Sequence, residues 1–125
     1  MEMGKLESKI AVIGVGNMGQ AIVSGLLKQN LVLKKHLFLS HSSEDNKRVA
    51  ENSDIIILAV KPQQINQVLL SIKDVVSAKQ LIISIVAGVE ITNIKKLLNR
   101  DQWIVRVMPN LAVTVGKSIS VWVKS

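Results

Sequence analysis

The sequence predicts an α/β domain in which a parallel sheet is covered by helices on both faces. Runs of aliphatic and β-branched residues, such as IIILAV at 55–60, are typical of parallel strands buried on both sides. Stretches with apolar residues three and four positions apart follow these runs, as expected of helices that pack on a sheet. Because the two patterns alternate along the chain, we expect a doubly wound sheet within one domain that spans residues 1–125.

The first half of the chain predicts three strands. An apolar run after Lys9 forms the first strand, meets a glycine-rich turn and continues with helical spacing through Ile22. The segment HLFLS at 36–40 is expected to form the second strand, because Leu37 and Leu39 alternate with other residues. Residues 44–52 leave room for one short helix before the third strand at 55–60.

In the second half, Pro62 suits the first turn of a helix, and residues 81–86 are expected to form a buried strand that ends before Gly88. Apolar stripes predict two helices, one through Ile65, Val68, Leu69 and Ile72, and one through Ile91, Ile94, Leu97 and Leu98. A further strand is expected at 103–108 before Pro109, and the alternation at 118–123 predicts a last strand.

The turn between the first strand and its helix contains Gly14, Gly16 and Gly19 in the spacing G-x-G-x-x-G. In this strand-to-helix context the motif indicates a Rossmann-like dinucleotide-binding fold. Gly14 permits the tight turn, Gly16 lets the backbone approach a pyrophosphate, and Gly19 lets the helix pack close to its strand. The helix N-terminus would stabilise the phosphate charge. An ordinary glycine-rich turn without a ligand is the alternative.

The formal net charge of +7 invites a nucleic-acid interpretation, which the pattern does not favour. The cations are scattered, with no run longer than a pair, and the only aromatic residues are Phe38, Trp103 and Trp122. Single-strand binders need more stacking surfaces than this. We therefore expect no nucleic-acid partner, whereas a basic protein suits a polyanionic ligand such as a phosphorylated dinucleotide.

The chain contains no cysteine, which excludes disulfides and thiolate metal sites and is compatible with a reducing compartment. His36 and His41 lie close in sequence, but no nearby carboxylates complete a known ligand pattern, so no metal site is expected. The apolar run at 55–60 is far too short to span a membrane, and Glu2 and Glu7 do not suit a signal peptide. We expect a cytoplasmic protein without membrane contact.

The residues after the second strand bear on the choice of cofactor. An acidic residue there would bind the ribose hydroxyls of NAD, whereas this chain has Ser40, His41, Ser42 and Ser43. Hydroxyl groups and an imidazolium can donate hydrogen bonds to a 2′-phosphate, which favours NADP(H) over NAD(H). A simple polar turn is the alternative, because Glu44 and Asp45 are near and no arginine is present.

The motifs IGVGNMGQAI, AVKP, SIVAGV and RVMPN occur in this order and together resemble pyrroline-5-carboxylate reductase, the enzyme that makes proline by reducing a cyclic imine with NAD(P)H. The resemblance covers most of the chain and implies that the cofactor contacts three groups of residues. The pyrophosphate group is Ile13, Gly14, Val15, Gly16, Asn17 and Met18. The adenosine group is Ser40, His41 and Asn46. The nicotinamide group is Ala59, Val60, Lys61, Pro62, Ile85, Val86 and Ala87.

Three polar residues leave two interpretations open. Lys61 either binds the nicotinamide ribose or the acidic substrate, as the family motif suggests, or is a solvated lysine before a proline. Asn110 either orients groups on the substrate side or caps a turn after Pro109, and Arg106 either serves the site or pairs with a carboxylate of the scaffold. No acidic residue qualifies as a proton donor, so the catalytic residues stay unknown.

The chain departs from the family in its short connection of thirteen residues from His41 to Ser53. A crossover needs about ten to twelve residues, so one helix fits, and the family's third strand with its helix is expected to be missing. Because that strand would lie at the sheet edge, its loss leaves the order 2-1-4-5-6 in the family's numbering. Part of the adenosine pocket is expected to be lost with it.

Two further departures concern activity. Leu111 and Ala112 replace the family's threonine and proline, and the family's helical C-terminal domain, which forms the dimer and binds the substrate carboxylate, is expected to be absent. Hydride transfer needs two carbon atoms held close together away from water, so we expect the chain alone to be inactive. The leading hypothesis is therefore the cofactor-binding part of an NADPH-dependent imine reductase that makes proline.

Two other functions remain open. One is a non-catalytic dinucleotide-binding module that acts through a partner, and the other is a related imine or hydroxyacid reductase. The pairing of AVKP with MPN favours the leading hypothesis. Apolar residues at 113–123 predict an exposed surface, and hence self-association, for both the leading hypothesis and the non-catalytic binding module.

Overall fold

A computed structural model describes residues 8–14, 16–30, 32–40, 42–109 and 119–124. Within these residues six strands form one sheet in the order β2-β1-β3-β4-β5-β6. The strands are β1 Ile10–Ile13, β2 Leu37–Ser40, β3 Ile55–Leu58, β4 Leu81–Ser84, β5 Trp103–Pro109 and β6 Ile119–Lys124. The α-helices are α1 Asn17–Lys28, α2 Ser43–Glu51, α3 Ile65–Ile72 and α4 Ile91–Leu98, and short 3₁₀ turns occupy Lys34–His36 and Pro62–Gln64.

The first five strands are parallel, as the sequence predicts, and their register is continuous across the sheet. The last strand corrects the expectation of a wholly parallel sheet, because β6 pairs antiparallel with β5. A parallel pair needs a crossover of a dozen or more residues, usually a helix, whereas only nine residues separate β5 from β6. The chain therefore folds back directly and places β6 at the edge.

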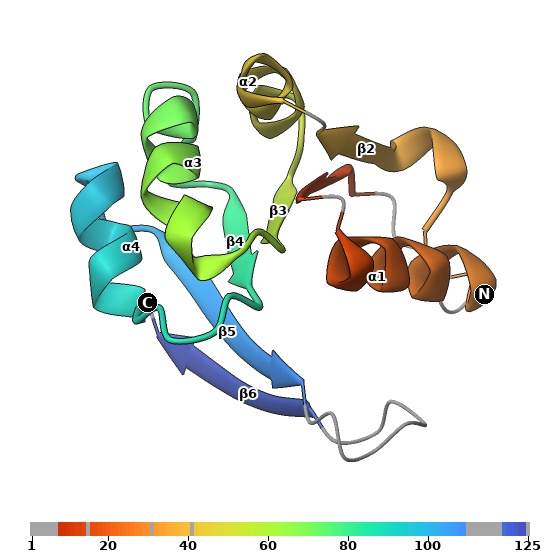
Figure 1. Cartoon of the computed structure of the whole chain (residues 1–125). Coiled ribbons are helices and arrows are strands. Elements are labelled where there is room, and N and C mark those ends of the chain that lie inside the picture. The colour runs from red at the N-terminus through yellow and green to blue at the C-terminus, as the bar shows by residue number, and fades with distance from the viewer. Residues whose placement is uncertain (1–7, 15, 31, 41, 110–118, 125) are drawn as a thin grey trace.

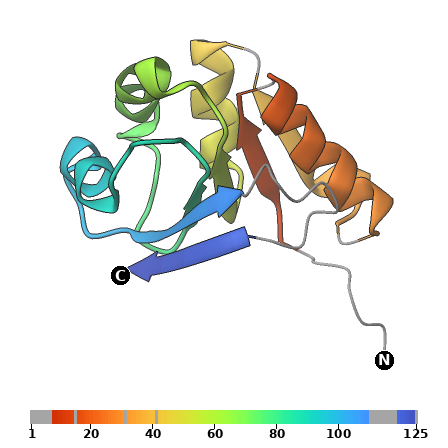
Figure 2. The ribbon, with the colours of Figure 1, turned by 60° about the horizontal axis from the view of Figure 1, so that its bottom comes forward.

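The helices cover both faces of the sheet, which confirms the doubly wound prediction (Figures 1 and 2). One core unites α2, α3 and α4 with alternate residues of β1, β3, β4 and β5, and its centre is formed by fully buried side chains such as Ile56, Leu69 and Ile82. On the opposite face, α1 packs on Val12 and Ile57 through Val23 and Leu26. This alternation of buried faces follows from the period of two in each strand.

The short connection between β2 and β3 contains α2, a helix of nine residues. It crosses from the edge strand β2 past β1 to β3, so the strand order agrees with the predicted order that lacks the family's third strand. Val49 and Ala50 are buried and anchor α2 in the same core as α3. As a result, α2 lies beside α3.

One part of the sheet keeps apolar side chains partly exposed. On the face that α1 covers, the side chains of Ile55, Leu81, Ile83 and Val105 are only half-buried, and Trp103 is 56% exposed. They lie on β3, β4 and β5, whereas α1 packs mainly on β1 and its neighbours. The described part of the chain thus leaves an apolar area on this face.

Candidate functional site

A cavity of about 440 Å³ opens where β1, β2 and β3 end. Parallel strands place their carboxyl ends on one side of the sheet, and ligands of open α/β sheets bind there. The cavity brings together residues of the predicted pyrophosphate, adenosine and nicotinamide groups, together with part of α3. Its lining residues are Ile13, Gly14, Gly16, Ser40, Ser42, Asn46, Ala59, Val60, Lys61, Gln64, Gln67 and Val68.

The glycine-rich turn has little room for side chains at two of its three glycines. Gly14 has a φ of +105°, and a Cβ atom added there would lie 2.6 Å from the carbonyl oxygen of Ala59. A Cβ atom on Gly19 would lie 1.9 Å from the carbonyl oxygen of Gly14. The first turn of α1 therefore lies so close to the ends of β1 and β3 that neither position has room for a side chain, which agrees with the structural roles predicted for Gly14 and Gly19.

Gly16 differs from the other two glycines. It is the N-cap of α1, it lines the cavity, and no atom of the described residues lies within 4 Å of a Cβ atom built on it. The space next to its Cα atom is therefore open to a ligand at the N-terminus of a 12-residue helix. Such a position fits a phosphate group, because the helix N-terminus carries positive partial charge.

The segment after β3 forms the opposite wall. Pro62 begins a 3₁₀ turn, in which the amide of Gln64 donates to the carbonyl oxygen of Lys61 at 2.8 Å. The Gln64 side chain returns the contact, since its Oε1 atom accepts from the Lys61 amide at 3.3 Å. Lys61 is exposed at the cavity wall, so its ammonium group can reach an anionic ligand without being buried.

A chain of hydrogen bonds lies under the adenosine side of the cavity. The Ser40 hydroxyl donates to the Asn46 Oδ1 atom, and the Asn46 Nδ2 atom donates to the Ser71 hydroxyl at 3.2 Å. Ser71 in turn donates to the carbonyl oxygen of Val68 at 2.5 Å. Ser40 and Asn46 are buried, at 3% and 6% exposure. The chain thereby joins the end of β2 to α2 and α3.

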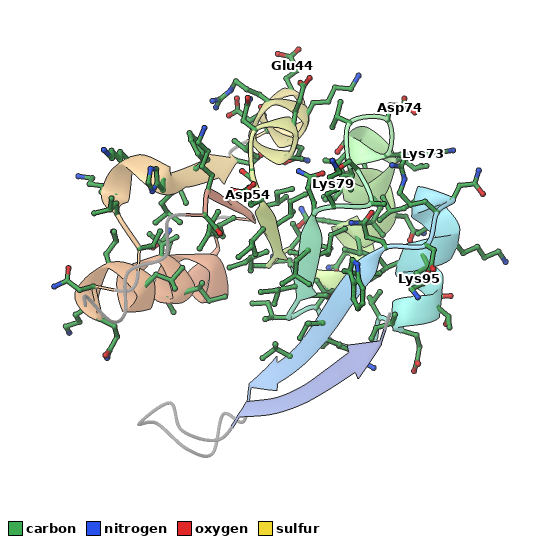
Figure 3. All side chains as sticks on the ribbon, turned by 180° about the vertical axis from the view of Figure 1, so that it is seen from behind. Glu44, Asp54, Lys73, Asp74, Lys79 and Lys95 are labelled. Atoms are coloured by element: carbon green, nitrogen blue, oxygen red, sulfur yellow. The ribbon has the colours of Figure 1, made fainter. Side chains whose placement is uncertain are left out.

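At the start of α2, the Ser42 hydroxyl accepts a hydrogen bond from the Asp45 amide at 3.2 Å and caps the helix. Asp45 forms an ion pair with Arg48 at 3.4 Å. Glu44 is exposed and points away from the sheet in Figure 3. Among the described residues, no carboxylate side chain lines the cavity, so the acidic pair that follows β2 does not face it.

Four residues of the predicted nicotinamide group lie outside the lining of this cavity. Neither Pro62 nor the residues Ile85, Val86 and Ala87 line it. The Val86 side chain is 3% exposed and packs in the core, and its amide donates to the Ser84 hydroxyl at 3.3 Å. Their predicted contact with the nicotinamide therefore stays a prediction.

Arg106 lies on β5 opposite Ser84 of β4. Its Nη1 atom is 4.0 Å from the Glu90 Oε1 atom, and its Nε atom is buried without a hydrogen-bond partner in the described part of the chain. This geometry agrees with the scaffold interpretation, in which Arg106 pairs with a carboxylate at the start of α4.

Some predicted residues cannot be placed. Val15, His41 and Asn110 lie outside the described residues, and the side chains of Asn17 and Met18 are not described although their backbone begins α1. Conversely, sequence reasoning does not identify Gln64, Gln67 and Val68 as cavity residues. The apolar stripe of their segment predicts a helix that packs on the sheet. Nothing in that stripe indicates that α2 would lie beside this helix and that both would line a cavity.

Within the described ranges, no three His, Cys, Asp or Glu side chains approach closely enough to hold a metal ion. Over the same ranges, none of the helices has the length and apolar character that a membrane span requires.

Comparison with known proteins agrees with this geometry. The family model described as "NADP oxidoreductase coenzyme F420-dependent" matches residues 9–88. Among curated relatives, pyrroline-5-carboxylate reductase of Methanosarcina acetivorans is 36% identical over 90% of this chain and 47% of its own length. The enzyme of the same name from Aquifex aeolicus is 38% identical over 91% of this chain and 47% of its length.

Solved structures give the same result. Plasmodium falciparum pyrroline carboxylate reductase with NADP bound superposes with a TM-score of 0.82 at 31% identity, and covers 97% of this chain and 50% of that one. The reductase from Coxiella burnetii superposes with a TM-score of 0.76 at 33% identity and covers 94% of this chain and 49% of that one. The chain thus spans about half the length of the relatives it matches.

Proposed function

This chain belongs to the family whose model is described as NADP oxidoreductase, coenzyme F420-dependent, and we propose that its cavity binds NADP(H) for the reduction of a cyclic imine. The observation that carries the proposal is the cavity itself, where the N-cap glycine of α1, the Ser40–Asn46 pair and Lys61 line one space. Hydrophobic, hydroxyl, amide and cationic groups in this arrangement suit a dinucleotide, which has two ribose rings and a charged pyrophosphate.

The preference for NADP(H) over NAD(H) rests on the end of β2. Ser40 and Ser42 line the cavity there, and no carboxylate of the described residues does so. A carboxylate would repel a 2′-phosphate, whereas a hydroxyl group such as that of Ser42, which accepts from the Asp45 amide, can donate a hydrogen bond to it. The net charge of +7 further raises the local concentration of the more anionic cofactor.

The proposed reaction is the reduction of 1-pyrroline-5-carboxylate to L-proline in the cytoplasm, and the name of the curated relatives, pyrroline-5-carboxylate reductase, supports it. Bound NADPH would supply the hydride. The residues described here would bind and orient that cofactor, with Lys61 and Asn110 as candidates on the substrate side. Hydride transfer also needs an imine held in near contact and shielded from water, so we expect the isolated chain to bind the cofactor without reducing the imine at a normal rate.

A second candidate function is a non-catalytic dinucleotide-binding module that acts through a partner or a second copy. The apolar area around Trp103 supports it, because large exposed apolar patches mark interaction surfaces. The predicted surface at 113–123 lies in part outside the described residues, so the homo-oligomer stays a proposal.

Titration calorimetry of the purified chain with NADPH and NADH tests the proposal. We expect micromolar NADPH binding and weaker NADH binding. Gly16→Ala should weaken NADPH binding, whereas Gly25→Ala is the matched control, since Gly25 also has open space around its Cα atom but does not line the cavity. Absence of binding to either dinucleotide refutes the proposed function. Robust turnover of the imine by the purified chain would refute the expected inactivity.

A further inference from the structure

The chain of hydrogen bonds under the cavity runs from Ser40 through Asn46 to Ser71. Only one of its two ends determines how the Asn46 carboxamide is oriented. At the Ser40 end, the hydroxyl group lies within bonding distance of two acceptors, the Asn46 Oδ1 atom and the Ser42 carbonyl oxygen at 3.1 Å. If the Asn46 carboxamide were rotated by half a turn, its NH₂ group could donate to the Ser40 oxygen while Ser40 donates to Ser42. The Ser40 end therefore accepts either orientation of the carboxamide.

The Ser71 end accepts only one orientation. The Ser71 hydroxyl has a single hydrogen atom, and it donates this hydrogen to the Val68 carbonyl oxygen at 2.5 Å. Its oxygen can then only accept from Asn46, so the NH₂ group must face Ser71, at 3.2 Å. Were the carboxamide reversed, either two oxygen atoms would face each other without a hydrogen between them, or Ser71 would lose its hydrogen bond to Val68.

We infer that Ser71 is a positioning residue of the cavity, because it sets which atoms of the Asn46 carboxamide face the ligand. The inference rests on the proposed function only where it concerns the dinucleotide. Ser71 is not among the residues that line the cavity and acts through Asn46, which does line it. With one N–H group directed to Ser71, Asn46 keeps a second N–H group for an acceptor on the adenosine part of the cofactor.

The contact between Asn46 and Ser71 of α3 is explained by the short connection after β2. Because α2 follows β2 directly, Asn46 of α2 lies next to Ser40 at the end of β2 and also next to α3. The interaction spans 25 residues in sequence and joins two elements that each supply part of the cavity wall. Loss of the Ser71 hydroxyl would therefore loosen the adenosine side without removing a wall residue.

The first experiment needs no ligand. In ¹⁵N-labelled protein, the side-chain amide hydrogens of Asn46 are assigned by their loss in Asn46→Asp, and their exchange with solvent is measured. We expect protection in the wild type, about ten-fold faster exchange in Ser71→Ala, and wild-type exchange in Ser71→Thr, which keeps the hydroxyl. Ser24→Ala, an exposed helical serine away from the cavity, is the matched control. Unchanged exchange in Ser71→Ala overturns the inference.

The second experiment separates positioning from a general loss of stability. NADPH, 2′,5′-ADP and nicotinamide mononucleotide are titrated into each variant, and thermal midpoints are measured in parallel. Ser71→Ala should weaken NADPH and 2′,5′-ADP by about three- to ten-fold, leave the mononucleotide unchanged, and be rescued by Ser71→Thr. Equal losses for the two serine variants would overturn the inference. If the wild type binds no nucleotide, the proposed function fails, and the exchange data alone decide the role of Ser71.

Discussion

The three glycines of the turn should respond to the same substitution in two different ways. In Gly19→Ala, the new Cβ atom would lie 1.9 Å from the Gly14 carbonyl oxygen, about 1.5 Å short of ordinary contact. The obstacle is backbone, so α1 has to move away from the turn. Overpacking of this kind costs about 1–3 kcal/mol, which corresponds to a fall of roughly 3–12 °C in Tm for a domain of this size.

Gly14→Ala should be at least as destabilising, because the added methyl group would lie 2.6 Å from the Ala59 oxygen in a backbone conformation with φ of +105°. Such a conformation costs a side chain about 1–3 kcal/mol by itself. Gly16→Ala, in contrast, has an extended backbone and open space. Its loss of stability should stay below about 1 kcal/mol, the difference between glycine and alanine as N-cap.

The loss of NADPH affinity should be largest in Gly16→Ala, the variant that loses the least stability. Gly16→Ala places a methyl group in the cavity where a pyrophosphate would approach the backbone, so NADPH binding should fall about ten-fold or more in a protein of nearly unchanged stability. Circular dichroism melts give Tm, and calorimetry gives the affinity. The reasoning would be refuted by a Gly19→Ala protein that melts within about 1 °C of the wild type, or by a Gly16→Ala protein with unchanged affinity.

Three other substitutions test separate parts of the structure. Gln80→Leu removes the hydrogen bonds that the buried side chain donates to the Ala50 and Ser53 carbonyl oxygens, at 2.7 and 2.5 Å. It should lower the free energy of unfolding, measured by urea denaturation, by about 2–4 kcal/mol. A loss under about 1 kcal/mol would contradict this expectation. Lys61→Gln should weaken NADPH binding about three-fold in low salt, with the difference disappearing in high salt, and a salt-independent difference would argue against a charge effect. Trp103→Lys should reduce self-association in analytical ultracentrifugation, and unchanged sedimentation would exclude the apolar face as the contact.

Most of the fold could be predicted because the apolar composition of its strands indicates that they are buried. Runs such as 55–58 have no polar residue, so a central parallel position is the only one that suits them. The direction of β6 could not be predicted in the same way, because alternation gives the exposed and buried faces of a strand but not its orientation. The nine residues that precede it, too few for a crossover, are the signal that points to an antiparallel return.

The candidate site was predictable where the backbone forms it. Gly14 and Gly16 belong to a motif whose spacing follows from backbone conformation, so their place at the cavity can be expected from local sequence. Gln67 and Ser71 carry no such signal. Their role depends on the contact between α2 and α3, a long-range contact that the local pattern of α3 does not indicate.

The loss of a strand and a helix beside β2 therefore need not remove the adenosine side of the site. The shortened connection brings α2 across to α3, and the two helices together supply Asn46, Gln67 and Val68 to the cavity. The buried bond between Asn46 and Ser40 ties this new wall to the end of β2. Since Ser40, Asn46 and Ser71 all find partners, we expect the cavity to bind adenosine nucleotides without the missing strand.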